Sequence, residues 1–203
     1  IKPENKQLVL DTIRNTVYEM EKWSKMKLEI FRGDSFQIVI DNPYEAVRIA
    51  ILIRAGLQKS TPEGSEIKWD ARLALGLGSV NFSQEESVTE SDGEAFRNSG
   101  WEFDELGKRK LAIRTPWQNM NDELKVSTAF ADDIVSEWSV AQAQAIYASL
   151  IHSKTQKEIA ADLNTSPQNI SKRIIAGKEY LIRPYLDRCK QIITAKIQTD
   201  GIK

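Results

Sequence analysis

The sequence predicts an α+β fold over residues 1–138, in which helices cover a mostly antiparallel sheet, and an all-helical fold over residues 139–203. Helical apolar spacing alternates with short β-rich runs in the first part, whereas only helical spacing follows Ser139. The charge changes at the same place: residues 1–138 carry 18 basic and 24 acidic side chains, and residues 139–203 carry 10 and 5. The resulting net charges of −6 and +5 are hidden in a total of −1. Such asymmetry indicates a nucleic-acid contact at the basic end.

The composition is that of a globular protein. Hydrophobic residues make up 41% and charged residues 28%, which excludes a disordered chain, a collagen-like fibre and a disulfide scaffold. The single cysteine, Cys189, has no partner for an internal disulfide bond, so we expect a reducing, cytoplasmic environment. No run of about 18 uncharged apolar residues occurs, and Ile1–Lys6 is not a signal peptide, so we expect no membrane partner.

The elements of the first part alternate between helices and short strands. Apolar residues at three- or four-residue steps predict the helices, and β-branched or aromatic runs predict the strands. The predicted order is a helix over 3–26, strands over 27–31 and 36–40, a helix over 44–59, a strand over 67–78, a loop over 81–92, a helix over 93–106, a strand over 111–114 and a helix over 119–138. The helix over 44–59 is apolar on more than one side, which predicts burial on more than one face.

The spacing of capping residues predicts two short helices joined by a tight turn in the second part, after a helix over 140–151. Thr155 followed by Glu158 is a capping box that begins the first short helix. Asn164 tolerates the left-handed backbone that a tight turn needs. Ser166 then caps the second short helix, and Pro167 occupies its first position.

This pattern resembles the helix-turn-helix of sigma-factor region 4 and related bacterial regulators, with Asn164 in place of the usual glycine of the turn. The resemblance implies that the second helix enters the major groove of double-stranded DNA. Gln168, Asn169 and Lys172 would face the bases, and glutamine and asparagine can pair bidentately with adenine. The residues that the resemblance places at the DNA are Thr165, Ser166, Gln168, Asn169, Ser171, Lys172, Arg173 and Lys178.

A single unit of this kind would bind DNA weakly, so we expect a homodimer that contacts two half-sites. The long last helix, over 178–197, has side chains available for a partner, namely Tyr180 or Leu181, Tyr185, and Ile192 or Ile193. Two alternatives stay open for the helix pair: a helical hairpin that only packs, and a helix-turn-helix that binds protein.

Three segments of the first part resemble the class III nucleotide cyclases over residues 1 to about 115. They are a hairpin over 31–36 with Asp34 at its tip, a strand over 72–76 and a helix start over 93–99. The whole chain is similar to SatD-like bacterial proteins, which join a cyclase-like domain to a helical C-terminus. The resemblance implies a ferredoxin-like antiparallel sheet, a Mg²⁺ or Mn²⁺ ion on Asp34 with a nucleotide, and a phosphate near Arg97.

The sequence departs from the cyclase pattern at several positions. The family's first strand, which ends in a metal-binding Asp, is expected to precede Ile1. The base-selecting residue falls at Ile30, and the transition-state Asn and Arg fall at Arg97 and Trp101. An apolar side chain cannot select a purine edge, and Trp101 cannot neutralise phosphate charge. The cyclase-like part is therefore interpreted as a non-catalytic sensor or dimerisation domain.

The sequence as a whole predicts a DNA-binding protein of the transcriptional-regulator type, with a nucleotide as a candidate effector. The alternative is a metal-dependent nucleotide-binding or cyclase-type enzyme that uses Asp34. His152 is the only histidine, which excludes a multi-histidine metal site and predicts a surface or phosphate-facing side chain. Cys189, between Arg188 and Lys190, is either a packed thiol or a reactive one.

Overall fold

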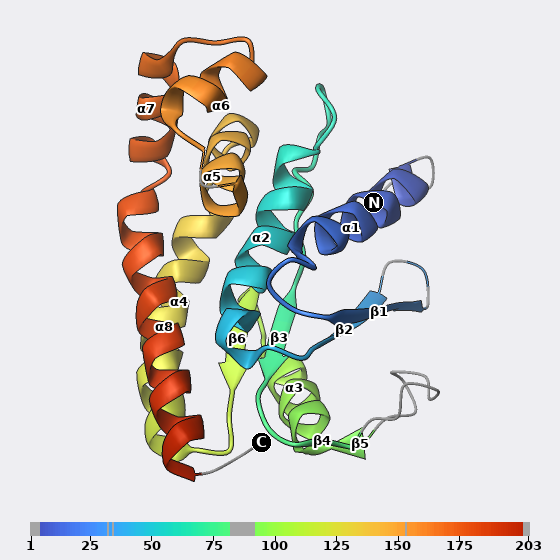
Figure 1. The fold of residues 1–203 in the computed structure, drawn as a ribbon. Helices are drawn as coiled ribbons and strands as arrows, with labels where there is room; N and C mark the ends of the chain where they lie inside the picture. Colours follow the sequence, from blue (N-terminus) through green and yellow to red (C-terminus); the bar gives the residue numbers. More distant parts are fainter. Residues whose placement is uncertain (1–4, 32, 34, 82–91, 153, 201–203) are drawn as a thin grey trace.

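The structure is a computed structural model that describes residues 5–31, 33, 35–81, 92–152 and 154–200 (Figure 1). It is an α+β fold with one helix at its centre. The label η marks a short 3₁₀ helix. The elements in chain order are α1 (Lys6–Met20), β1 (Met26–Phe31), β2 (Ser35–Ile40), η2 (Pro43–Glu45), α2 (Ala46–Lys59), β3 (Leu73–Gly76), β4 (Val80–Asn81), β5 (Asp92–Gly93), α3 (Glu94–Asp104), β6 (Leu111–Arg114), α4 (Gln118–Ser136), α5 (Val140–His152), α6 (Gln156–Asp162), α7 (Pro167–Ala176) and α8 (Glu179–Asp200).

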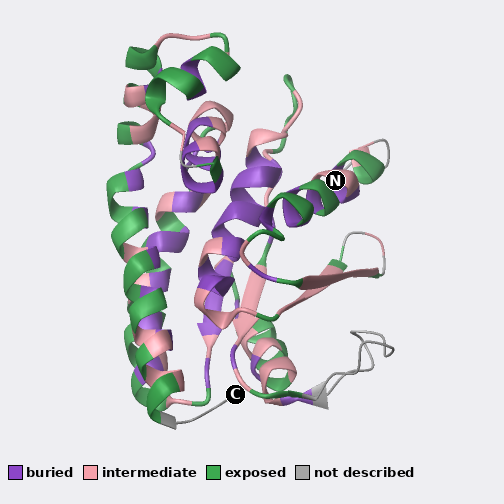
Figure 2. Ribbon diagram, viewed as in Figure 1, coloured by how far each residue is buried: buried purple, intermediate pink, exposed green. Residues whose placement is uncertain are grey.

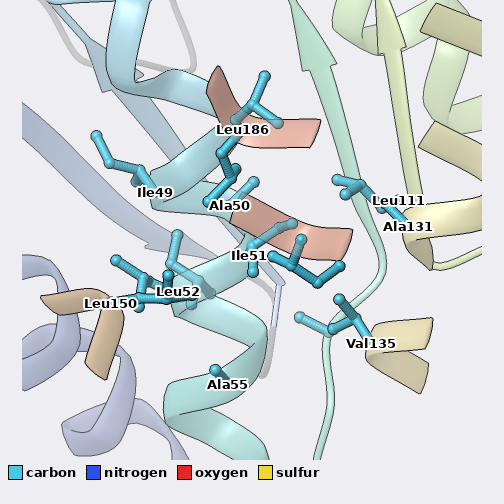
Figure 3. Close-up of a cluster of buried hydrophobic side chains, with 14 of the residues drawn as sticks. Ile49, Ala50, Ile51, Leu52, Ala55, Leu111, Ala131, Val135, Leu150 and Leu186 are labelled. Atoms are coloured by element: carbon cyan, nitrogen blue, oxygen red, sulfur yellow. The ribbon is translucent and has the colours of Figure 1, made fainter. Parts of the chain in front are cut away.

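The central helix α2 is covered on every side (Figure 2). Every residue from Ile49 to Gln58 is buried. Helices α1, α5 and α8 pack against α2, and Figure 3 shows its Leu52 in one cluster with Leu150 of α5 and Leu186 of α8. Burying each such side chain contributes about 2 kcal/mol relative to leaving it in water. The predicted burial on more than one face is confirmed.

The strands form pairs and not the single, mostly antiparallel sheet that the sequence predicts. Among the described residues there are three two-stranded sheets, β1–β2, β3–β6 and β4–β5. β1 and β2 form an antiparallel hairpin with Met26 opposite Ile40, whereas β3 and β6 run parallel with Leu73 opposite Leu111. The parallel pairing follows from the connection, because the chain crosses over through α3 before it enters β6.

Helix α3 lies close against β3 because two glycines leave room for its backbone. A Cβ at Gly76 would collide with the carbonyl oxygen of Ala95, and one at Gly78 would collide with the amide nitrogen of Ala95. Asn98, which is buried, donates its Nδ2 hydrogen to the carbonyl oxygen of Leu77 at 2.7 Å. These contacts fix α3 on one face of the β3–β6 pair.

Two predicted elements are shorter in the structure. Helix α1 ends at Met20 because the following residues turn toward β1, and Asn42 donates to the carbonyl oxygen of Trp23 at 2.9 Å. The predicted strand over 67–78 is reduced to β3, because the N–H of Trp69 donates to Thr61 Oγ1 at 3.0 Å outside any strand ladder. The sequence did not predict the short β4–β5 pair, and most of the predicted loop over 81–92 lies outside the described residues.

A buried network of charges joins α2, α4 and the segments that lead into β3 and β6. The fully buried Arg54 donates from Nε and Nη2 to the two carboxylate oxygens of Asp70, both at 2.9 Å, and from Nη1 to Asp132 at 2.6 Å. Lys110 Nζ lies 3.0 Å from Asp70. Burial alone would raise the pKa of Asp70, but hydrogen bonds and charges from Arg54 and Lys110 hold that pKa below its ordinary value.

Both parts of the chain contribute to one core. Its buried members from the helical part include Ile146, Leu150, Ile182 and Leu186. The division into domains at residues 1–138 and 139–203 stays a prediction, while α5 and α8 pack directly on α2. Among the described residues, no helix combines the length and the apolar character needed to cross a membrane.

Candidate nucleic-acid interface

Helix α6 begins as the sequence predicts. Thr155 Oγ1 accepts the N–H of Glu158 at 3.3 Å, and Glu158 Oε2 accepts the N–H of Thr155 at 2.8 Å, which completes the capping box. The hydrogen bonds from the Thr155 side chain and backbone hold the pKa of Glu158 below its usual value. The carboxylate is therefore charged at the positive end of the α6 dipole.

The turn between α6 and α7 is built on the predicted residues. Asn164 has a φ of 47°, in the left-handed region, and the N–H of Thr165 donates to the carbonyl oxygen of Ala160 at 2.9 Å. Ser166 Oγ then accepts the N–H of Asn169 at 3.2 Å and caps α7, with Pro167 at its first position. The predicted caps and turn are confirmed.

The inner faces of α5, α6 and α7 form a small core of their own. Its fully or almost fully buried members are Ala145, Ile159, Ala160 and Ile170, and Ala148, Leu163 and Ile174 pack against them. The two alanines let the helices approach closely, because they add little volume between the backbones. Helix α7 is thus held by one apolar face, and its opposite face points away from the protein.

That opposite face of α7 is polar and open. Gln168, Asn169 and Lys172 are all exposed, as the resemblance implies. The Asn169 amide donates from Nδ2 to Thr165 Oγ1 at 3.2 Å, so its carbonyl oxygen is oriented by this contact. Ile175 is 63% exposed and was missed by the sequence analysis, although its spacing from Gln168 and Lys172 places it on the same face.

The remaining predicted residues flank this face. Ser171 and Arg173 are half-buried, as are Thr165 and Ser166 at the start of α7. Lys178 is exposed and has a φ of 55° in the turn that leads to α8. The structure therefore brings all eight predicted residues to one end of the molecule, at the top of the view in Figure 1.

The far end of α7 is anchored to the main core. Trp138, which is buried, donates its Nε1 hydrogen to the carbonyl oxygen of Gly177 at 2.6 Å. A Cβ at Gly177 would collide with the Cδ1 atom of Ile146, so a larger residue here would require the Ile146 side chain to move. These contacts fix the orientation of α7 relative to α5 and to the rest of the protein.

His152 lies at the end of α5 among other polar side chains. It is exposed, and its Nε2 lies 3.8 Å from Glu19 Oε2, which also accepts a hydrogen bond from the Tyr147 hydroxyl at 2.9 Å. Lys22 Nζ donates to the carbonyl oxygen of Ile151 at 2.6 Å. Partial burial holds the pKa of His152 below its usual value, which favours the neutral imidazole.

The cyclase-like positions are only partly described. Asp34, the predicted metal ligand, lies outside the described residues, whereas Arg97 is exposed on α3. Ile30 is half-buried, and the exposed Trp101 ring lies 5.5 Å from the Arg114 guanidinium. Within the part of the chain that the structure describes, no three His, Cys, Asp or Glu side chains are grouped so that they could hold a metal ion.

The helical part settles two further points. Cys189 is buried and burial raises the pKa of its thiol to about 12, which confirms the packed interpretation over the reactive one. Of the α8 side chains expected to be available to a partner, Ile193 is fully buried, and Tyr185 and Ile192 pack against the main core. The prediction is wrong for Ile193, because α8 covers α2 and α4 with this side chain. Tyr185 and Ile192 are half-buried, and the availability of α8 to a partner stays a prediction.

Comparisons with protein-family models, with curated proteins and with solved structures find no match to this chain.

Proposed function

We propose that this protein binds double-stranded DNA as a transcriptional regulator, with α6 and α7 as a helix-turn-helix. The observation that carries the proposal is the two-sided character of α7. Ile170 holds its inner face in the small core, while Gln168, Asn169 and Lys172 stand exposed on the outer face. A helix fixed in this way can enter the major groove and keep its register there.

The exposed side chains suit the chemistry of a base pair. Gln168 and Asn169 can each donate to N7 and accept from the N6 amino group of adenine, and Lys172 can donate to guanine or to a phosphate. Each well-made bidentate pair discriminates against a wrong base by about 1–3 kcal/mol. The N–H groups at the start of α7, together with Thr165 and Ser166, suit contacts to the phosphate backbone.

The other cationic residues supply the sequence-independent part of the affinity. Arg173 and Lys178 flank the base-facing side chains, and Ser171 lies between Asn169 and Lys172 along α7. Since the helical part carries a net charge of +5, it attracts the duplex, whereas the first part carries −6 and repels it. In this proposal the first part is a non-catalytic, cyclase-like sensor or dimerisation platform, the protein acts as a homodimer, and a nucleotide is its candidate effector.

Salt-dependent binding to duplex DNA tests the proposal. Fluorescence anisotropy of a labelled mixed-sequence duplex is recorded at several salt concentrations, and the logarithm of the binding constant is plotted against that of the salt concentration. We expect a clearly negative slope for the wild type, because each phosphate contact releases counterions. The double variant Lys172→Ala/Arg173→Ala should have a slope that is shallower by up to about 0.9 per lost contact.

A matched control is Lys108→Ala, because Lys108 is exposed between α3 and β6, away from α7. This variant should bind with the wild-type slope. Binding that does not depend on salt, an absence of binding, or an equal loss in the control variant would each refute the proposed function.

A further inference from the structure

Helices α4 and α8 lie side by side along one edge of the molecule (Figure 1). Arg188 Nε of α8 lies 2.8 Å from Glu123 Oε1 of α4, and the Tyr185 hydroxyl lies 2.8 Å from Thr128 Oγ1. The later residue of α8 thus meets the earlier residue of α4, so the two helices are antiparallel. Phe130 lies seven residues after Glu123 on α4, and Leu181 lies seven residues before Arg188 on α8. Because seven helical residues rise about 10 Å, Phe130 and Leu181 lie at the same height along the helix pair.

The outer surface of this helix pair carries an apolar stripe. Three- and four-residue steps from Glu123 lead along α4 to Val126 and Phe130, which are 59% and 70% exposed. The same steps back from Arg188 lead along α8 to two further exposed apolar residues, Pro184 and Leu181. We call this surface the α4–α8 seam. Its side chains are Glu123, Val126, Phe130 and Asp133 of α4, and Arg188, Pro184, Leu181 and Lys178 of α8 and the turn before it. An exposed apolar stripe with polar ends is typical of a protein interface.

The seam is complementary to itself. Level by level, α4 presents Glu123, Val126, Phe130 and Asp133, and α8 with its preceding turn presents Arg188, Pro184, Leu181 and Lys178. An acidic side chain of α4 therefore lies at the level of a basic one of α8, and apolar side chains lie at the level of apolar ones. A rotation by 180° about an axis parallel to the seam would bring α4 of one copy onto α8 of another with every level matched.

We propose that a second copy of this chain docks on the α4–α8 seam and forms a symmetric dimer with a four-helix core. From Glu123 to Asp133 the seam covers about 15 Å along α4, and it is roughly 20 Å wide, from the rise per residue and the diameter of its helices. This area is smaller than the area of about 800 Å² per partner that stable interfaces use, and the neighbouring exposed residues of α4 and α8 would add to the contact. We propose a second copy as the partner because the charges and apolar side chains of the seam match those of the same seam after rotation. Binding of an unrelated protein would not require the seam to match itself.

This inference deepens the proposed function, and it rests on that function only for its biological purpose. Since α7 lies at one end of the seam, the axis places both α7 helices at the same end of the dimer, where two half-sites of a duplex can be reached. The dimer itself is defined without DNA. A dimer that fails to bind duplex DNA would refute the proposed DNA binding and leave this inference intact. A monomer that binds DNA would refute the dimer and leave the proposed DNA binding intact.

Sedimentation equilibrium of the full chain without DNA tests the seam. The wild type should be dimeric, and Phe130→Glu should raise the dissociation constant of the dimer at least about thirtyfold, because it buries a charge in the apolar centre. Ile67→Glu is the matched control, since Ile67 is 71% exposed in the segment between α2 and β3. It should leave the dimer intact. A monomeric wild type, or an equal effect of both variants, would overturn the proposal.

Disulfide trapping avoids any effect of a buried charge on folding. Phe130→Cys and Leu181→Cys are made in separate preparations, which are then mixed and oxidised mildly. The mixed disulfide between the two variants should dominate, because the axis brings α4 of one copy to α8 of the other. The native Cys189 is buried and should not compete. A mixture that yields no mixed disulfide, or mainly the Phe130→Cys self-disulfide, would show that the seam is not used in this way.

Discussion

Two single residues define how the candidate recognition helix is connected. Among the described residues, Asn164 and Lys178 are the non-glycine positions with positive φ, at 47° and 55°. They stand immediately before and after the α7 region, one in the turn from α6 and the other in the turn to α8. Asparagine tolerates the left-handed region better than most residues because its short side chain forms local hydrogen bonds. Both ends of α7 are thus set by backbone conformations that few side chains adopt readily.

Substitution of Asn164 should separate backbone conformation from side-chain chemistry. Asn164→Ala should lower the free energy of unfolding by about 1 kcal/mol. Alanine is unfavourable in the left-handed conformation, and its side chain forms no hydrogen bond that would compensate. Asn164→Gly should be close to neutral, since glycine adopts this conformation freely. Urea unfolding of the three proteins, followed by circular dichroism, measures both changes. Equal losses for alanine and glycine would instead indicate that the Asn164 side chain itself is required.

A buried charge network around Arg54 lies between the elements of the first part. It connects α2 to α4 and to the segment before β3 through Asp70 and Asp132. A buried guanidinium is tolerated in a core because its carboxylate partners compensate its charge. Removal of one partner destabilises the fold strongly, because it leaves an uncompensated charge in the core. Replacement of the whole ion pair by apolar side chains changes the free energy of unfolding much less.

This network should make the protein sensitive to acid. The folded-state pKa of Asp70 lies below its ordinary value, so its contribution is present above the unfolded pKa of about 4 and is lost as the pH falls through the folded value. Asp70→Asn should cost up to about 3–5 kcal/mol at neutral pH, because the buried Arg54 loses one of its two carboxylate partners and keeps only Asp132. Urea unfolding at neutral and acid pH measures this. The difference between the wild type and Asp70→Asn should shrink as the pH is lowered, and a constant difference would contradict the assignment.

At the scale of elements, local signals predicted more than pairing signals. The capping box at Thr155, the turn at Asn164 and the cap at Ser166 depend on neighbours within a few residues, and all three are present. The parallel β3–β6 pair could not be found in this way, because strand pairing depends on where a crossover connection leads. Helical periodicity likewise shows that α8 has a buried face, but not that Ile193 reaches the core.

The whole molecule should unfold as one unit. Since α5 packs on α2 and also holds α6 and α7, neither part can lose its structure without exposing apolar surface of the other. Differential scanning calorimetry should therefore show a single transition whose calorimetric and van't Hoff enthalpies agree. Two resolved transitions would indicate that residues 1–138 and 139–203 are thermodynamically independent domains.

The hydrogen bond from Trp138 to the carbonyl oxygen of Gly177 also has an electrostatic consequence. This contact links α7 to the main core, in which both parts of the chain take part. The net charges of −6 and +5 are therefore carried by parts of one packed molecule. If the proposed DNA-binding function holds, an approaching polyanion is attracted by the helical part and repelled by the first part, so the charge arrangement itself favours one orientation of approach.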